Sequence, residues 1–349
     1  MPRLSFERFI MLHLGSSLTQ NTNSNLNSHC KYNNKKDRMD EKVEKKIMDE
    51  EEEHSRMLRK CVENMTRIKP PNQSNFRVYA IIVLNNAKGE RVELSGTNSE
   101  CPEIGQSLCA ERSAAVRLRE VGEGYDVKTV YLISDMLDEP ITPGLLCREY
   151  LVEACPRLDV RILIATRDLK KRRWTVLRDL WPCPSLYRRL NAREIDSKTV
   201  LNERTKMTIP KSYRKLHKFL CNLVAKKRDD DALHPVRYVA GIELENGITL
   251  VEFARKGLEY GTSMDGVSAM LPAILSSSSK PVRGIRLDHF GVLHAPCAVA
   301  RARLFEQPKC DSLQFLVHVQ EDDVVELKEV TVDRLAPDFP KWRGGCGCA

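Results

Sequence analysis

Cys109-Ala110-Glu111-Arg112 and Thr142-Pro143-Gly144-Leu145-Leu146-Cys147-Arg148-Glu149 are the two segments that organise the chain. Thiolates are soft ligands that suit zinc, and a catalytic zinc site holds three protein ligands and one water molecule. Cys109 and Cys147 supply two thiolates, and Glu111 supplies an acid that can carry protons. Gly144 has no side chain and cannot ligate. The two segments therefore predict a zinc site that lacks one of its usual ligands.

Length and composition place the chain among globular proteins with two domains. It has 349 residues, of which 30% are charged and 42% hydrophobic, and no apolar run approaches the ~18 residues of a membrane-spanning helix. The net charge of +8 is spread along the sequence, so it does not argue for a nucleic-acid or membrane partner. The twelve cysteines are unevenly spaced and no secretory signal precedes them, which favours a reducing, cytoplasmic location.

The N-terminal region differs in composition from the rest. Residues 1–36 are rich in Asn, Ser and Leu and poor in acids. This composition fits either a disordered tail or a mitochondrial transit segment, and the latter would give a mitochondrial location. Residues 35–60 are highly charged and predict a solvated helix. We expect an N-terminal extension over 1–56, a domain with the site motifs over 57–187, a linker over 188–211 and a second domain over 212–349.

The first domain is predicted to alternate strands and helices. Residues 76–84 are apolar and rich in β-forming residues, and a turn over 85–89 returns the chain as a second strand over 91–96. Residues 109–120 have helical spacing, which places Cys109 and Glu111 in a first turn, where the helix dipole lowers the pKa of a thiol. This alternation predicts an α/β fold. The remaining elements are expected over 127–134, 160–166 and 174–177 (strands) and within 143–154 (a helix).

Residues 167–173 form a basic cluster, Arg-Asp-Leu-Lys-Lys-Arg-Arg. Aromatic residues are not interleaved through this cluster, so a solvated hairpin turn is a better interpretation than a nucleic-acid surface. The hypothesis of a nucleic-acid binder or editor therefore rests only on this cluster and on the overall charge.

The second half of the chain repeats features of the first. Residues 236–247 echo the strand and turn that begin at Phe76, and residues 294–301 echo residues 141–148. The offset in residue number between the two copies is taken from the corresponding prolines, Pro143 and Pro296. Applied to the site residues Cys109, Glu111 and Cys147, this shift gives Thr262, Met264 and Ala300. The second copy is therefore predicted to lack a zinc site.

Four motifs together resemble the nucleoside cytidine deaminases: Ser74-Asn75-Phe76-Arg77-Val78, Gly96-Thr97-Asn98-Ser99-Glu100, Cys109-Ala110-Glu111-Arg112 and the segment from Pro143 to Arg148. Zinc deaminases carry His (or Cys)-x-Glu followed by Pro-Cys-x-x-Cys, and Gly144 stands here in place of the first cysteine of the second motif. The resemblance covers roughly residues 57–180. It implies duplicated three-layer α/β/α domains with a mixed central sheet, of which the C-terminal copy is degenerate.

The resemblance also implies roles for single residues. Cys109 and Cys147 would be ligands of Zn²⁺, and Glu111 would shuttle the proton. Arg112 would donate hydrogen bonds to the ligand thiolates. Gly144 marks the missing ligand position.

The implied reaction is the zinc-dependent hydrolytic deamination of cytidine or deoxycytidine in pyrimidine salvage, carried out on a small-molecule nucleoside by a homodimer. Phe76 would lie against the pyrimidine, and Asn98 and Glu100 would hydrogen-bond the ribose hydroxyls. A cysteine in the first ligand position points to free nucleosides rather than polynucleotides. Because Gly144 leaves zinc short of a ligand, the alternative is a catalytically inactive, deaminase-derived structural or regulatory protein.

Overall fold

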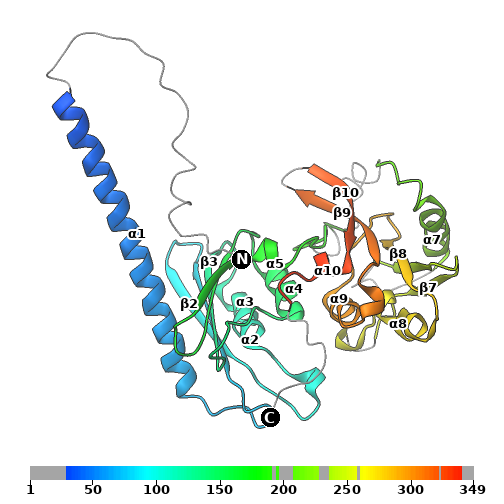
Figure 1. Ribbon diagram of the computed structural model, residues 1–349, viewed down its shortest axis with the longest axis horizontal. Coiled ribbons are helices and arrows are strands. Elements are labelled where there is room, and N and C mark those ends of the chain that lie inside the picture. The colour runs from blue at the N-terminus through cyan, green and yellow to red at the C-terminus, as the bar shows by residue number, and fades with distance from the viewer. Residues whose placement is uncertain are drawn as a thin grey trace. The chain divides into compact units, whose positions relative to one another are not determined.

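The computed structural model describes residues 29–190, 194–195, 207–227, 236–257, 260–321 and 324–339 (Figure 1). By its contacts the chain divides into two units, residues 1–55 and residues 56–349. Most of the predicted transit segment and most of the predicted linker lie outside the described residues, and the domain boundaries remain predictions. None of the described helices combines the length and the apolar composition that a membrane crossing requires.

The first sheet has five strands in the order β2-β1-β3-β4-β5. β3 and β4 run parallel, and the other neighbouring pairs are antiparallel, so the sheet is mixed as predicted. Successive residues of a strand point to opposite faces, and both faces of β1 are apolar, so both need a cover. The strands are β1 (Val78–Asn85), β2 (Arg91–Thr97), β3 (Asp126–Ser134), β4 (Arg161–Ala165) and β5 (Arg172–Val176).

Helices cover both faces of this sheet. On one face lie α2 (Ala110–Val116), α4 (Leu145–Ala154) and the short α5 (Leu177–Leu180). On the other face lie the last turns of α1 (His29–Thr66), from Met57 to Met65. The predicted three-layer α/β/α arrangement is therefore confirmed, and the predicted solvated helix over 35–60 is part of α1. The β1 residues under α2 and α4 are Ala80, Ile82 and Leu84, and those under α1 are Tyr79, Ile81 and Val83.

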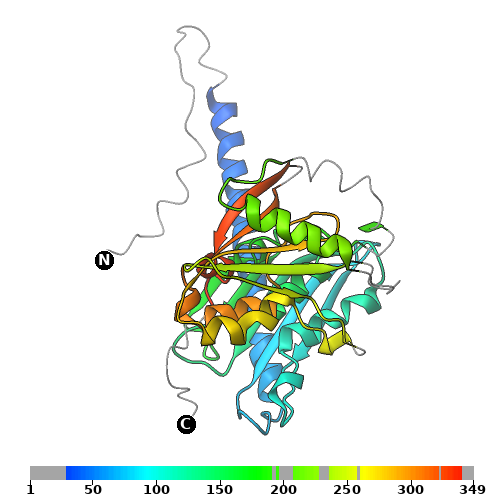
Figure 2. The same ribbon diagram turned by 90° about the vertical axis from the view of Figure 1, so that its right-hand side faces the viewer.

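The second sheet has the same topology as the first. Its order is β7-β6-β8-β9-β10, and again only the third and fourth strands in sequence are parallel. α7 (Arg214–Lys226) packs on one face, and α8 (Gly266–Ser276) and α9 (Ala298–Phe305) pack on the other (Figure 2). The remaining elements are β6 (Tyr238–Leu244), β7 (Thr249–Phe253), β8 (Pro281–Asp288), β9 (Gln314–Glu321), β10 (Val324–Thr331) and α10 (Val332–Leu335).

Two expectations for the first domain are refined by the structure. The helix predicted over 109–120 is two shorter helices, α2 and α3 (Leu118–Val121), separated at Arg117. Cys109 is the N-cap residue of α2 rather than a residue of its first turn. The basic cluster is confirmed as part of a hairpin, because residues 167–171 connect the paired strands β4 and β5 and the last two residues of the cluster begin β5. Its residues are largely exposed.

The prediction that Thr262 and Met264 replace Cys109 and Glu111 is wrong. The bridge from Ser99 to Leu108 before α2 matches the bridge from Arg255 to Met264 before α8. The next residue is the N-cap in each case, Cys109 and Asp265. The true counterparts of Cys109, Glu111, Gly144 and Cys147 are therefore Asp265, Val267, Cys297 and Ala300.

A single shift fails because the second copy is shorter between its two helix starts. The N-caps Cys109 and Gly144 are 35 positions apart, whereas Asp265 and Cys297 are 32 positions apart. The shift read from the prolines is therefore correct for Ala300 and three residues too small for the counterparts of Cys109 and Glu111. The second copy still lacks a thiolate at two of these positions, as predicted.

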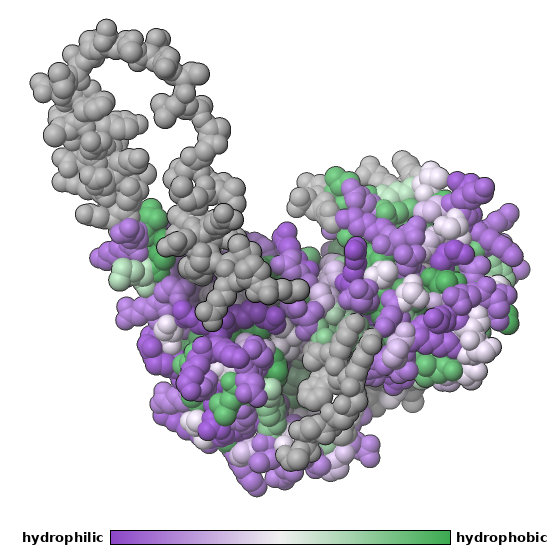
Figure 3. All heavy atoms as spheres, viewed as in Figure 1, coloured by the Kyte–Doolittle hydropathy of each residue, from purple (hydrophilic) through white to green (hydrophobic). Residues whose placement is uncertain are grey.

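The visible face of the described residues is mostly hydrophilic, with hydrophobic residues scattered over it (Figure 3). The large apolar side chains of the strands lie instead between the sheets and their helices. Burial of this area is the main stabilising contribution to such layered folds.

Candidate metal centre

Cys109 is placed by the close approach of α2 to β2. A Cβ atom at Gly96 of β2 would lie 2.4 Å from the backbone oxygen of Ala110 and 2.4 Å from the nitrogen of Ala114. Only glycine allows the helix to come this near. Cys109 caps the helix in an extended conformation and makes no side-chain capping hydrogen bond. The Cys109 thiol is therefore not used in capping the helix and can take part in another interaction.

Cys147 is placed by the first turn of α4, whose entry is fixed by Arg148. The Arg148 guanidinium is fully buried and donates to the carbonyl oxygens of Pro143 (2.7 Å) and Leu180 (3.0 Å), and also to that of Pro337. These bonds clamp the loop that precedes the helix. Sequence reasoning gave Arg148 no role, although its repetition as Arg301 in the second copy was a usable signal.

The side chains of Cys109, Glu111 and Cys147 converge on one point. Their potential ligand atoms all lie within 4.8 Å of one another. Cys147 and Glu111 are buried and Cys109 is half-buried. Among the residues that the structure describes, no further His, Cys or acidic side chain joins this group. The two helix starts thus bring together the three residues that the sequence singled out.

Arg112 completes the polar surroundings of the two thiols. Its Nη2 donates to the Ser107 carbonyl at 3.0 Å and lies 3.9 Å from the Sγ of Cys109. Its Nε is buried without a hydrogen-bond partner among the described atoms. A positive side chain beside a thiol favours the thiolate, which is the form that binds metal.

The three ionisable groups of the cluster differ in the direction in which their pKa values are shifted. A hydrogen bond from Cys147, assisted by Arg112, lowers the pKa of Cys109 to about 6. The same bond to Cys109, together with burial, raises the pKa of Cys147. Burial, with the negative charge of Cys109 nearby, raises the pKa of Glu111 to about 7. These shifts favour the thiolate form of Cys109 over that of Cys147, and they bring the pKa of Glu111 close to neutral pH.

The donor set suits zinc but is one thiolate short of the usual three ligands. Gly144 is the N-cap of α4 with φ −65° and ψ 159°, and an added Cβ atom there would meet no other atom within 4 Å. The site therefore has room for a side chain where the third ligand is missing. Cys297, at the equivalent N-cap of α9, has nearly the same backbone angles, φ −69° and ψ 170°.

Phe76, Asn98 and Glu100 lie together at the start of β1. Asn98 accepts a hydrogen bond from the Val78 amide (2.8 Å) and donates to the Phe76 carbonyl (2.8 Å) and to Glu100 (3.2 Å). Glu100 also accepts from the backbone and the hydroxyl of Ser74. A carboxylate has about four acceptor positions, so Glu100 keeps capacity for a ligand hydroxyl. The Asn98 amide group, in contrast, uses both its donors within the protein.

Two solved structures are similar to about a third of the chain. A cytidine deaminase from Burkholderia pseudomallei is 20% identical, and the match covers 36% of this chain and 98% of that chain with a TM-score of 0.30. A cytidine deaminase from Mycobacterium leprae is 24% identical over 36% of this chain and 93% of that chain, with a TM-score of 0.27.

The family model of the cytidine and deoxycytidylate deaminase zinc-binding region matches residues 51–161. The matched segment contains Cys109, Glu111 and Cys147, the three residues whose ligand atoms converge. Residues 51–161 are therefore similar to the zinc-binding region of the cytidine and deoxycytidylate deaminases.

Proposed function

We propose that the chain hydrolyses the exocyclic amino group of free cytidine or deoxycytidine, with zinc held by Cys109 and Cys147. The observation that carries this proposal is the convergence of two thiols and a buried carboxyl group within 4.8 Å. Zinc bound between the thiolates would lower the pKa of a water molecule and so supply hydroxide at neutral pH.

Glu111 is suited to move the proton in this reaction. A general acid or base works best when its pKa lies near the working pH, and burial raises the pKa of Glu111 to about 7. The Glu111 carboxylate can accept a proton from water and, once protonated, can donate to the pyrimidine ring nitrogen. The family chemistry then releases ammonia and leaves uracil.

The start of β1 is the proposed place for the sugar and base. Glu100 retains acceptor capacity for a ribose hydroxyl. Phe76, whose carbonyl accepts a hydrogen bond from Asn98, supplies an aromatic ring from the same segment. Asn98 forms hydrogen bonds with the Phe76 carbonyl and the Val78 amide and also donates to Glu100. It therefore positions both this segment and the Glu100 side chain. We propose a free nucleoside as substrate and a homodimer as the working assembly.

The test is cytidine turnover, measured together with zinc content per chain, for the wild type and for Glu111→Gln. Loss of the proton carrier should abolish turnover by several orders of magnitude, since general acid–base catalysis alone contributes about 10²–10⁴-fold. Both proteins should retain zinc, because Glu111 is not assigned as a ligand. A wild type with stoichiometric zinc and no turnover would contradict the proposal.

The second candidate is a deaminase-derived structural or regulatory protein without turnover, and Gly144 is the observation that favours it. Two thiolates hold zinc less tightly than three. If the wild type contains no zinc and is inert at saturating zinc, while its fold is intact, this second function replaces the first.

A further inference from the structure

Each copy holds the segment before α4 or α9 with one buried arginine, Arg148 in the first copy and Arg301 in the second. Arg148 Nε donates to the Pro143 carbonyl at 2.7 Å, and Arg301 Nε donates to the Pro296 carbonyl at 2.8 Å. Each arginine also donates to the last carbonyl of the short helix of its own copy, at 3.0 Å and 3.1 Å. This arginine clamp is therefore part of the fold of both copies.

The two clamps also join the copies to each other. The arginine of the first copy donates to the Pro337 carbonyl, in the segment that follows α10. The arginine of the second copy donates to the Pro182 carbonyl at 2.8 Å, in the segment that follows α5. The next residues, Asp338 and Cys183, both have a positive φ, 54° and 53°. The two segments that cross between the copies are therefore structural equivalents.

The two clamps differ by one hydroxyl group. In the second copy Nη2 of the arginine donates directly to the Cys183 carbonyl, at 3.0 Å. In the first copy Nη2 of Arg148 donates instead to Oγ1 of Thr142, at 3.0 Å. The same hydroxyl donates to the Asp338 carbonyl, also at 3.0 Å. The residue before the proline of the second copy is Ala295, which has no hydroxyl, so the second copy makes this contact without a relay.

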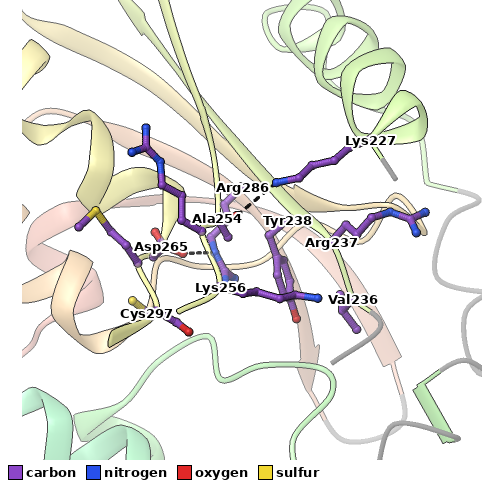
Figure 4. A pocket seen from close by; sticks show the side chains of 12 residues that line it. Lys227, Val236, Arg237, Tyr238, Ala254, Lys256, Asp265, Arg286 and Cys297 are labelled. Atoms are coloured by element: carbon purple, nitrogen blue, oxygen red, sulfur yellow. Dashed lines mark hydrogen bonds and ion pairs between the residues drawn. The ribbon is translucent and has the colours of Figure 1, made fainter. Parts of the chain in front are cut away.

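The copy that has the hydroxyl is also the copy that has the metal cluster. In the second copy an ion pair between Arg286 and Asp265 stands at the helix start that corresponds to Cys109, and Cys297 lines the same cavity (Figure 4). The second copy therefore keeps the arginine clamp without a pair of thiols. The Thr142 hydroxyl is not needed to form the clamp, and it is present where the clamp holds a candidate metal site.

We propose that Thr142 is a positioning residue of the metal centre, an inference that rests on the zinc site proposed above. Thr142 begins the segment that contains Gly144, the missing ligand position, and that leads into the helical turn of Cys147. Two hydrogen bonds hold its hydroxyl between the Arg148 guanidinium and the Asp338 carbonyl. The hydroxyl thereby fixes this segment relative to α4. Residues that orient metal ligands without touching the metal typically change its affinity by about 10–100-fold when they are lost.

The acceptor of this relay comes from the second copy, which thereby takes part in positioning the site of the first. Ala336 belongs to the apolar core of the first copy, and Phe339 packs against that core. Between them, the Asp338 carboxylate forms an ion pair with Arg173 at 3.6 Å. The acceptor carbonyl is thus held by its neighbours on both sides, as an acceptor that positions a hydroxyl has to be.

The test is the zinc affinity of the full chain, measured by competition against a chelator of known affinity, for the wild type, Thr142→Ala and Thr142→Ser. Thr142→Ala introduces the residue type of the second copy, whose clamp forms without a hydroxyl, so this variant should fold. Thr142→Ser keeps the hydroxyl and loses only a methyl group. Thr166→Val is the matched control, because the Thr166 hydroxyl bonds Asp168 and the Lys171 backbone in the hairpin between β4 and β5.

Thr142→Ala should bind zinc about 10–100-fold more weakly than the wild type, because the relay that positions the ligand segment is lost. Thr142→Ser and Thr166→Val should bind zinc as the wild type does. Urea unfolding of the zinc-free proteins checks that each variant is folded.

A hydroxyl with a purely structural role would change the stability of the protein and leave the zinc affinity of the folded state unchanged. Equal zinc affinity of the wild type and a folded Thr142→Ala would therefore overturn the proposal, and so would an equal loss of affinity in Thr142→Ser. A wild type that binds no zinc would instead contradict the proposed metal centre, and this inference with it.

Discussion

Substitution of Gly144 by cysteine tests the central feature of the proposed metal centre. The backbone there already has angles that any residue adopts, and an added Cβ atom would meet nothing within 4 Å. Cys297 occupies the equivalent N-cap in nearly the same conformation. The variant Gly144→Cys should therefore fold as the wild type does.

The gain in zinc affinity can be worked out from the number of ligands. Structural zinc sites with four protein ligands have binding free energies of about 10–16 kcal/mol, so one thiolate contributes about 3 kcal/mol. This free energy corresponds to about a hundredfold lower Kd. Gly144→Cys should therefore bind zinc about a hundredfold more tightly than the wild type and should raise cytidine turnover at limiting zinc.

The assay is competition for zinc against a chelator of known affinity, with Gly144→Ala as the matched control. Alanine makes the same change in backbone entropy but adds no sulfur. If Gly144→Cys binds zinc no better than Gly144→Ala, the thiol at this position does not reach the pair formed by Cys109 and Cys147. The interpretation of Gly144 as the missing ligand would then be wrong.

Three further predictions concern stability, each measured by urea unfolding. Gly96→Ala should cost at least about 1–3 kcal/mol, because its Cβ atom would overlap the α2 backbone, whereas Gly144→Ala should cost almost nothing. Arg148→Met should cost about 3 kcal/mol or more, because it leaves several buried carbonyl oxygens without donors. Burial opposes ionisation of Asp135, but hydrogen bonds from Arg77 outweigh it and hold the pKa of Asp135 below its ordinary value. Their stabilisation is present above about pH 4 and is lost as the pH falls further, so Asp135→Asn should be less stable at neutral pH and should lack this acid-dependent loss.

The strands and the metal cluster could be predicted because their signals are local. Apolar β-rich runs of the right length mark the strands, and Cys109 and Glu111 are close in sequence at a helix start. The sequence also predicted Cys147 near the start of a second helix. The N-termini of two helices that pack on the same face of one sheet can bring their first residues close together. Short-range sequence patterns were thus sufficient to predict most of the strands and helices of the first domain.

Other features depend on partners that are distant in sequence. The buried position of Arg148 is explained by its hydrogen bonds to the carbonyl oxygens of Leu180 and Pro337. No local sequence pattern predicts acceptors that are so distant in sequence. The counterpart of Cys109 was misplaced because a difference of three residues lies inside a segment without a recognisable motif. Hydrogen-bond register, which only the structure gives, located Asp265.

The two copies differ in how many changes separate them from a thiolate metal site. In the second copy the equivalents of all three cluster residues differ, and Arg286 already supplies a positive charge to Asp265 at the helix start. A bound cation would have to displace that guanidinium, which costs the ion pair and leaves a buried charge unpaired. In the first copy only Gly144 departs from the zinc-deaminase pattern, and the space at that position is open. A single substitution can therefore decide the chemistry of the first copy, whereas no single substitution can convert the second.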